Sequence, residues 1–281
     1  MNDVKMSVVV IKLGGKLLSQ GEEFNYVIED IVDIINNSNK NVVLVHGGGP
    51  QINEMLIALG KEPRIVKSVS GMESRITDKE TVDVAQMVMV GKLNKLLVSM
   101  FEKLNIKAVG LSGIDGSIIK AKRKDKLKII DEKTGKKMVF RGDYSGRIES
   151  VDPTLINLLL EKGYLPIIAP IGIGHEFEPL NLDGDRTAGH IAAALKADSL
   201  LLFTDVKGVY INNEIVKEIG KEEINTILDK VSGGMRKKIY AAKEALELGI
   251  NTVYIGSGMI EKPISTVLNG KSGTAISWKF V

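Results

Sequence analysis

The chain has 281 residues, of which 44% are hydrophobic and 26% charged, with a formal net charge of +3. This predicts a globular protein that buries the core of one large domain or of two lobes. Cysteine is absent, which excludes disulfides, thiolate metal sites and cysteine nucleophiles, and three scattered histidines argue against a zinc or Ser-His-Asp mechanism. No apolar run reaches about 18 residues and the N-terminus lacks a signal-peptide pattern, so we expect a cytoplasmic protein without membrane contact.

Short apolar runs alternate with helix-periodic stretches along the chain. Strands are predicted at 7–13, 41–47, 107–113, 165–172, 199–205 and 251–258, and helices at 24–36, 50–59, 77–104, 185–196 and 235–249. Such alternation is typical of βαβ units. It predicts an α/β fold with a mainly parallel sheet covered on both faces.

Several helix ends have recognisable signals. Pro50 suits the first position of a helix, and Thr77 with Glu80 has the pattern of a capping box for the helix that runs to about Leu104. Gly249 is expected to end the helix that begins near Met235.

Segment 120–141 concentrates positive charge. It holds ten Lys and Arg residues against three Asp and Glu, a net charge of +7, so the rest of the chain is net acidic. The turn residues DEKTGKK between two alternating runs predict a protruding basic β-hairpin. A solvated edge ribbon whose lysines deter strand pairing is the alternative. Nucleic-acid binding is disfavoured because Phe140 is the one aromatic residue in the segment.

Glycine turns follow the predicted strands at Gly14-Gly15, Gly47-Gly48-Gly49, Gly113, Gly172, Gly174 and Gly208. Ligands of parallel-sheet proteins bind beyond these strand ends, and bare backbone N–H groups suit phosphate. One glycine pair alone is more often a tight turn. The dinucleotide fingerprint fails because Ile52 stands where its third glycine belongs, and no complete P-loop is present.

Lys12 ends the first apolar strand directly before a glycine turn. A charge in that place needs a permanent partner or an anionic ligand. The alternative is an edge lysine that extends to water.

Nine motifs carry a resemblance to a known family. In chain order they are IKLGGK, VHGGGPQIN, SRITDKET, NKLLV, VGLSGIDG, IAPIG, NLDGDRTAGHIAAALKA, TDVKGVY and GGMRKK. From about residue 8 to the C-terminus they resemble the amino-acid kinase family, and within it the acetylglutamate kinase branch.

The resemblance implies a fold and an activity. The fold would be a three-layer αβα sandwich formed by one domain, 1–281, with a substrate-binding and dimerising N-lobe of about 1–174 and an ATP-binding C-lobe of about 175–281. Members of this branch transfer the γ-phosphoryl group of ATP, bound with Mg²⁺, to a side-chain carboxylate. A carboxylate is already a nucleophile at neutral pH, so no general base is needed and catalysis reduces to positioning and charge stabilisation. No metal site formed by protein residues is expected.

The resemblance also assigns residues to roles. Lys12 and Lys238 would stabilise the transferring phosphoryl group, Asp185 would organise both lysines, and Gly15 and Gly48 would donate backbone N–H groups. The residues expected to contact the acceptor are Gly48, Gly49, Arg75 and Asn181, and those expected to line the nucleotide are Asp205, Gly208 and Tyr210.

Three assignments have simpler alternatives. Asp185 by itself suits the N-cap of helix 185–196. Arg75 could form a surface ion pair. Lys237 adjoins Lys238, and motif spacing favours the latter.

The motifs ESRITD, NLDGD and RGDYSG depart from the usual acetylglutamate kinase pattern. They look more like the kinases of carrier-protein-dependent lysine synthesis, which phosphorylate 2-aminoadipate linked to the small acidic carrier LysW, and in some organisms also carrier-linked glutamate for arginine. The resemblance implies docking of this carrier on Lys122, Lys124, Lys126 and Lys128.

Two other functions stay open from sequence. One is an N-acetylglutamate kinase that acts on the free compound, and the other is a metabolite-binding regulatory protein that has lost catalysis. Only eleven residues precede Lys12, too few for the additional helix that accompanies arginine inhibition and hexamers in the family, so we expect a homodimer without that control.

Overall fold

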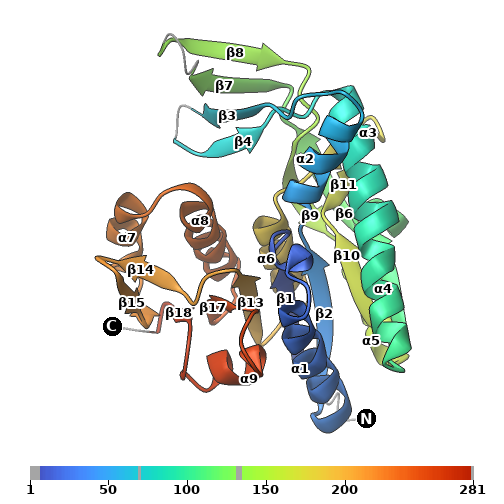
Figure 1. Ribbon diagram of the computed structural model, residues 1–281, viewed down its shortest axis with the longest axis vertical. Helices are drawn as coiled ribbons and strands as arrows, with labels where there is room; N and C mark the ends of the chain where they lie inside the picture. Colours follow the sequence, from blue (N-terminus) through green and yellow to red (C-terminus); the bar gives the residue numbers. More distant parts are fainter. Residues whose placement is uncertain (1–6, 69–70, 131–134, 280–281) are drawn as a thin grey trace.

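A computed structural model describes residues 7–68, 71–130 and 135–279 of the chain. Its main sheet has the strand order β16-β18-β17-β13-β1-β2-β10-β5 (Figure 1). The bounds are β1 (Ser7–Leu13), β2 (Lys40–His46), β5 (Ala108–Ser112), β10 (Leu165–Ala169), β13 (Ser199–Thr204), β16 (Glu218–Ile219), β17 (Val253–Ser257) and β18 (Thr274–Ile276). All neighbouring pairs in this order are parallel except β17 with β18. The predicted mainly parallel sheet is confirmed.

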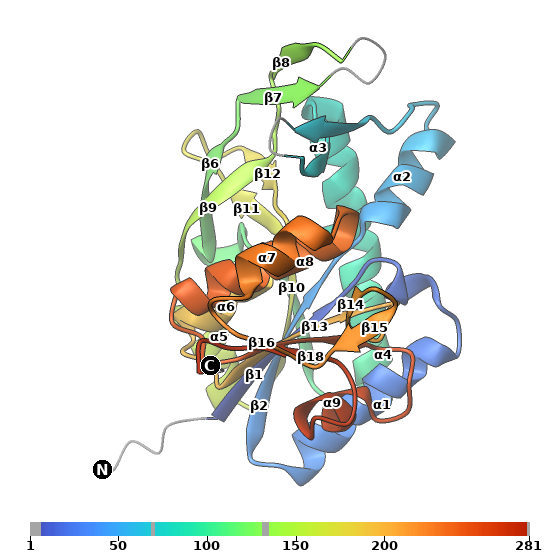
Figure 2. The same cartoon turned by 90° about the vertical axis from the view of Figure 1, so that its left-hand side faces the viewer.

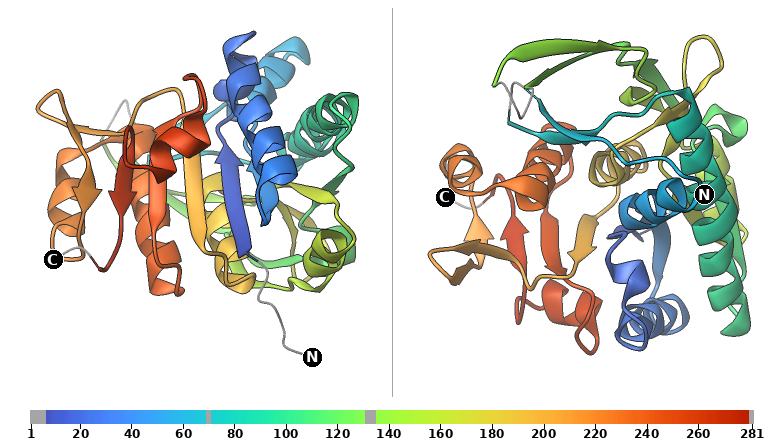
Figure 3. Two further views of the ribbon diagram at one scale, coloured as in Figure 1. Left: turned by 90° about the horizontal axis from the view of Figure 1, so that it is seen from below. Right: turned by 45° about the horizontal axis from the view of Figure 1, so that its top comes forward.

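Helices cover both faces of this sheet (Figure 3). One layer contains α1 (Glu23–Asn37), α4 (Asn94–Lys103) and α9 (Pro263–Leu268), and the other contains α5 (Thr154–Glu161), α6 (Gly184–Ala194), α7 (Ile224–Lys230) and α8 (Gly233–Glu247). β1 is apolar on both sides because Val8 and Val10 pack in the second layer, whereas Val9 and Ile11 pack in the first. The three-layer αβα sandwich is therefore confirmed.

Smaller sheets extend from the strand ends of the sandwich. One has the order β12-β11-β6-β9 and a second the order β4-β3-β7-β8, while β14 and β15 form a separate pair. The bounds are β3 (Ile65–Ser68), β4 (Glu73–Arg75), β6 (Ile119–Arg123), β7 (Lys126–Ile130), β8 (Lys137–Arg141), β9 (Gly146–Val151), β11 (Ile171–Ile173), β12 (Pro179–Asn181), β14 (Val209–Ile211) and β15 (Glu214–Val216). Figure 2 shows β6 and β9 leading from the body of the protein toward β7 and β8.

The basic segment is divided between two of these sheets. β7 and β8 pair antiparallel, but β7 also pairs with β3, and β6 pairs with β9 in the other sheet. The predicted turn lies partly outside the described residues, since 131–134 are not among them. A single protruding hairpin over 120–141 is not confirmed, because long-range pairing with β3 and β9 builds these strands into larger sheets.

The predicted helix 77–104 is observed as one run in three parts, α3 (Lys79–Gln86), the π-helical η2 (Met87–Leu93) and α4. Its N-cap is Asp78, whose side chain accepts a hydrogen bond from the N–H of Thr81. The capping box at Thr77 is therefore wrong by one residue, because the Thr77 N–H donates to Asp143. By length and composition the run Lys79–Lys103 could cross a membrane, and 44% of its most apolar window is buried inside the protein; one such helix is weak evidence of a membrane span, because core helices of soluble proteins can have the same length and composition.

The helices not yet described are α2 (Gly49–Ala58) and two short 3₁₀ turns, η1 (Leu17–Ser19) and η3 (Asp115–Ser117). Pro50 lies in the first turn of α2 as predicted. α8 ends just before Gly249, which has a φ of 105° and so takes the left-handed conformation expected after a helix.

Candidate active site

Alternation along β1 directs Lys12 toward one helical layer. Lys12 shares its phase with Val8 and Val10, which pack on the side of α6 and α8. It is only 6% exposed. The edge lysine extending to water, the alternative interpretation of Lys12, is therefore wrong.

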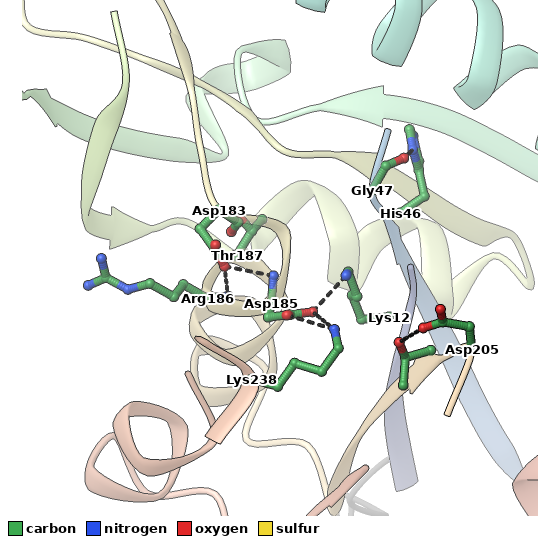
Figure 4. A network of polar contacts seen from close by, with 10 residues as sticks. Lys12, His46, Gly47, Asp183, Asp185, Arg186, Thr187, Asp205 and Lys238 are labelled. Carbon is green, nitrogen blue, oxygen red and sulfur yellow. Dashed lines mark hydrogen bonds and ion pairs between the residues drawn. The ribbon is translucent and has the colours of Figure 1, made fainter. Parts of the chain in front are cut away.

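Asp183 and Asp185 divide two roles at the start of α6. Asp183 is the N-cap, because its side chain accepts hydrogen bonds from the N–H groups of Asp185 and Arg186. The capping interpretation of Asp185 is therefore wrong. Asp185 lies in the first helical turn, and its carboxylate points toward the strand ends (Figure 4).

Lys12, Asp185 and Lys238 form a buried lysine–aspartate cluster. Lys12 Nζ lies 2.6 Å from Asp185 Oδ1, and Lys238 Nζ lies 2.9 Å from Asp185 Oδ2 (Figure 4). Asp185 is 7% and Lys238 9% exposed. Two ammonium groups share one carboxylate, so the cluster keeps a positive charge that a bound anion would neutralise. Lys238, which motif spacing favoured over Lys237, is therefore the lysine that pairs with Asp185.

Burial and pairing oppose each other in this cluster. Burial lowers the pKa of Lys12, although the attraction of the Asp185 carboxylate acts to raise it. Burial also disfavours the charge on Lys238, but the attraction and hydrogen bonds of Asp185 raise its pKa. Burial alone would raise the pKa of Asp185, whereas the two ammonium groups hold it below its usual range. The carboxylate is therefore ionised at neutral pH.

A clamp between α6 and α8 sets the spacing of the cluster. Arg186 Nε and Nη2 donate to the two carboxylate oxygens of Glu244, each at 2.6 Å. Burial would raise the pKa of Glu244, but the hydrogen bonds from Arg186 and His190 lower it to about 2. This bidentate pair holds Lys238 of α8 opposite Asp185 of α6. No local pattern in the sequence predicts this pair, because its partners lie 58 positions apart.

The glycine turns after β1 and β2 touch each other. A Cβ on Gly15 would lie 3.0 Å from both the Gly48 nitrogen and Pro50 Cδ, and one on Gly47 would lie 2.9 Å from the Gly15 nitrogen. These turns therefore require glycine because backbone meets backbone. Gly48 is buried against Leu93 and Met89.

His46 lies behind the second glycine turn and is completely buried. Its Nδ1 contacts the Gly47 carbonyl oxygen at 2.9 Å, and its Nε2 lies 3.3 Å from the Asn94 side-chain nitrogen. Asn94 also donates to the Ile167 carbonyl at 2.9 Å. Burial lowers the pKa of His46 to about 4, so the ring is neutral at pH 7. In the sequence, His46 directly precedes Gly47-Gly48-Gly49, and this position could have indicated that it supports the glycine turn.

Lys12 and Lys238 of the cluster line a cleft of about 1310 Å³, whereas Asp185 and the predicted site residue Gly48 do not line it. The lining includes Lys12, Gly15, Gly49, Arg75, Asn181, Asp205, Gly208, Tyr210, Lys238, Lys124, Lys126 and Lys128. Lys122, the fourth lysine expected to dock the carrier, does not line the cleft and lies exposed on β6. Most predicted site residues thus share one cleft between the sandwich and the β4-β3-β7-β8 sheet.

Two ends of the cleft can be distinguished. At one end, Arg75 donates to the Gly49 carbonyl at 2.9 Å and to the Asn53 side chain, so it faces the cleft and is not the surface ion pair of the alternative interpretation. At the other end, Asp205 accepts a hydrogen bond from Thr204 at 2.8 Å and pairs with Lys16 at 3.3 Å. The charge of the lysine–aspartate cluster suits a phosphoryl group. Its two lysines line the same cleft as Arg75 and Asp205.

Known proteins similar to this chain identify its family. The amino acid kinase family matches residues 7–257. A Cenarchaeum symbiosum protein, provisionally named LysW-aminoadipate/LysW-glutamate kinase, is 41% identical over 96% of this chain and 99% of its own length. The LysW-aminoadipate kinase of Deinococcus radiodurans is 38% identical over 97% of this chain and 92% of its own length. A solved Streptococcus mutans structure has a TM-score of 0.72 and 26% identity, covering 97% of this chain and 99% of that one. The chain therefore belongs to the amino acid kinase family.

Proposed function

We propose that this protein transfers the γ-phosphoryl group of ATP to the terminal side-chain carboxylate of 2-aminoadipate linked to a small acidic carrier protein, in lysine biosynthesis. An acceptor oxygen forms the new P–O bond while the bond to the β-phosphate oxygen breaks, giving an acyl phosphate and ADP. The observation that carries the proposal is the buried lysine–aspartate cluster, with two ammonium groups around one carboxylate. The names of the relatives supply the acceptor.

In this proposal the cluster stabilises the charge of the phosphoryl group in transit. Lys12 and Lys238 meet the phosphoryl oxygens from two sides, and Asp185 keeps both ammonium groups in place before ATP binds. Gly15 and Gly48 donate backbone N–H groups to the same oxygens. No general base is required, because the acceptor carboxylate is already ionised at neutral pH.

The acceptor would bind between Gly48, Gly49, Arg75 and Asn181. Arg75 offers a planar fork of donors that suits a carboxylate. Residues of about 1–174 would supply most of the acceptor and dimer side of the domain, and 175–281 would supply the nucleotide side.

Asp205, Gly208 and Tyr210 would line the nucleotide. The cleft is lined by separate carboxylates, those of Glu73, Asp183 and Asp205, and among the described residues no group of three or more acidic or histidine side chains gathers to hold a metal ion. This donor set fits Mg²⁺ that arrives on the phosphates of ATP and keeps its waters. Bound there, Mg²⁺ would neutralise charge on the β- and γ-phosphates.

The carrier would dock on Lys122, Lys124, Lys126 and Lys128. The last three line the cleft that holds Arg75, so an acidic partner held there would present its linked amino acid to the acceptor end. Carrier-linked glutamate would be a second acceptor, which the double name of the Cenarchaeum relative supports. Phosphorylation of this acceptor would serve arginine synthesis.

The assembly that we propose is a cytoplasmic homodimer without contacts to nucleic acid or membranes. Free N-acetylglutamate as acceptor is disfavoured because the relatives named here are kinases of LysW-linked substrates. A non-catalytic regulatory role is disfavoured because a sensor would not need the complete lysine–aspartate cluster.

An assay that couples ADP release to NADH oxidation tests the proposal with three acceptors: carrier-linked aminoadipate, carrier-linked glutamate and free N-acetylglutamate. We expect turnover with carrier-linked aminoadipate and little with the free compound. Equal or better turnover of free N-acetylglutamate would overturn the assignment of the acceptor. Inactivity with all three acceptors would overturn the proposed function.

A further inference from the structure

Asp143, in the RGDYSG motif between β8 and β9, is completely buried. Its carboxylate accepts hydrogen bonds from the Thr77 N–H at 2.9 Å, from the Ser145 N–H at 2.7 Å and from the Ser145 hydroxyl. Burying a carboxylate is costly unless its oxygens are satisfied. These three donors satisfy it, and the bond from Thr77 joins residue 143 to the segment that follows β4.

Segment 143–145 is bonded to both parts of the chain that carry the acceptor side chains of the proposed function. The Tyr144 N–H donates to the Thr77 carbonyl at 2.6 Å, and the Asn181 N–H donates to the Tyr144 carbonyl at 2.9 Å. The Thr77 hydroxyl donates to the Arg75 carbonyl at 3.3 Å and accepts from the Asn181 side chain at 3.4 Å. Segment 143–145 therefore lies between the end of β4, which carries Arg75, and the end of β12, which carries Asn181.

The same segment is joined to the start of the basic strand β7. The Arg123 guanidinium lies 3.6 Å from the centroid of the Tyr144 ring, and its Nε donates to the Asp143 carbonyl at 2.8 Å. The Lys124 N–H donates to the Ser145 carbonyl at 2.8 Å. A displacement of segment 143–145 would therefore be transmitted to the acceptor end and to the basic strand together.

We propose that Asp143 is a positioning residue that holds Arg75 and Asn181 at the spacing required by the acceptor. The inference rests on the proposed function, because it takes Arg75 and Asn181 as the acceptor-binding side chains. Asp143 itself does not touch the acceptor. It sets the affinity for the acceptor through Thr77 and Ser145, and the nucleotide end of the cleft is independent of it.

The test compares Asp143→Asn with a matched control, Asp30→Asn. Asp30 is also buried, and it also accepts from two backbone N–H groups and one serine hydroxyl, those of Ile264 and Ser265. In each variant an amide replaces a carboxylate, so at least one of these bonds is lost. We expect D143N to raise KM for the carrier-linked acceptor about tenfold while KM for ATP stays within about twofold of wild type. D30N should lower Tm and leave both KM values unchanged.

A second variant covers the case in which D143N does not fold. Thr77→Val keeps the shape and the N–H bond to Asp143, but it removes the hydroxyl that joins Arg75 to Asn181, so the same split in KM is expected. Folded variants that raise both KM values equally, or that leave the acceptor KM at the wild-type value, would overturn the inference. Wild type with no activity toward any acceptor would instead contradict the proposed function, so the two failures are distinguishable.

Discussion

The ammonium nitrogen of Lys12, at the end of β1, lies 2.6 Å from a carboxylate oxygen of Asp185 in the first turn of α6. Because Asp183 caps the helix, the Asp185 carboxylate is available to hold Lys12 and Lys238. The two lysines come from elements far apart in the chain, and the acid keeps them on one side of the cleft.

Replacing Asp185 by Asn should lower kcat by about 10²- to 10³-fold, because the amide cannot hold two ammonium groups against their mutual repulsion. Steady-state kinetics with saturating ATP and carrier-linked acceptor measures this loss. Asp30→Asn, another buried exchange of a carboxylate for an amide, should keep its kcat. A folded D185N variant with a kcat close to wild type would contradict the role of Asp185.

The double variant Lys126→Glu/Lys128→Glu should raise KM for the carrier-linked acceptor by about tenfold at low salt, since it replaces attraction for an acidic partner by repulsion. The difference from wild type should shrink as ionic strength rises. The control is Lys103→Glu/Lys107→Glu, which makes the same charge change at exposed lysines around the C-terminal end of α4. If both double variants have the same KM, the lysines on β7 do not dock the carrier.

The pKa of His46 predicts a pH dependence of stability. The unfolded chain binds a proton on this residue below about pH 6.5, whereas the folded protein does so only near pH 4. The unfolded state therefore binds more protons in this window, and the free energy of unfolding falls as the pH drops from 6.5 to 4, by about 3 kcal/mol at most.

Urea denaturation at a series of pH values measures this dependence. His46→Gln cannot titrate, so its free energy of unfolding should fall less steeply than that of wild type between pH 6.5 and 4. Parallel profiles of the two proteins would show that His46 takes up its proton equally in both states.

Thr274→Val should weaken the nucleotide end of the cleft. The buried Thr274 hydroxyl accepts from the Val209 N–H at 2.9 Å and donates to the Val216 carbonyl at 2.6 Å, so it fixes both strands of the β14–β15 pair beside Gly208 and Tyr210. Losing both bonds should raise KM for ATP about tenfold and leave KM for the acceptor unchanged. Thr274→Ser keeps the hydroxyl and should behave as wild type in both kinetic constants. An unchanged KM for ATP in T274V would contradict this positioning role.

Local patterns were enough to predict the main elements. The strands at 7–13, 41–47 and 199–205 were identifiable because residues buried on both faces of a parallel sheet must be apolar without interruption. The glycine turns and Lys12 could be placed at the strand ends because parallel strands share one direction. Motif spacing indicated Lys238 over its neighbour before any contact was known.

Long-range packing decided the rest. In NLDGD either aspartate could cap a helix, and only the backbone at the start of α6 assigns that role to Asp183 and turns Asp185 toward the lysines. Segment 120–141 contains alternating strands that local rules join into one hairpin, yet pairing with β3 and β9 divides it between two sheets. The roles of Asp143 and Glu244 could not be predicted from local patterns, since Thr77 and Arg186, which donate to them, lie 66 and 58 positions away. The amino-acid sequence alone determined the elements and the residue types at their ends, because short-range sterics and burial act on neighbours. Which of those residues meet was decided by the tertiary structure, because hydrogen bonds and ion pairs depend on distances that only the packed chain defines.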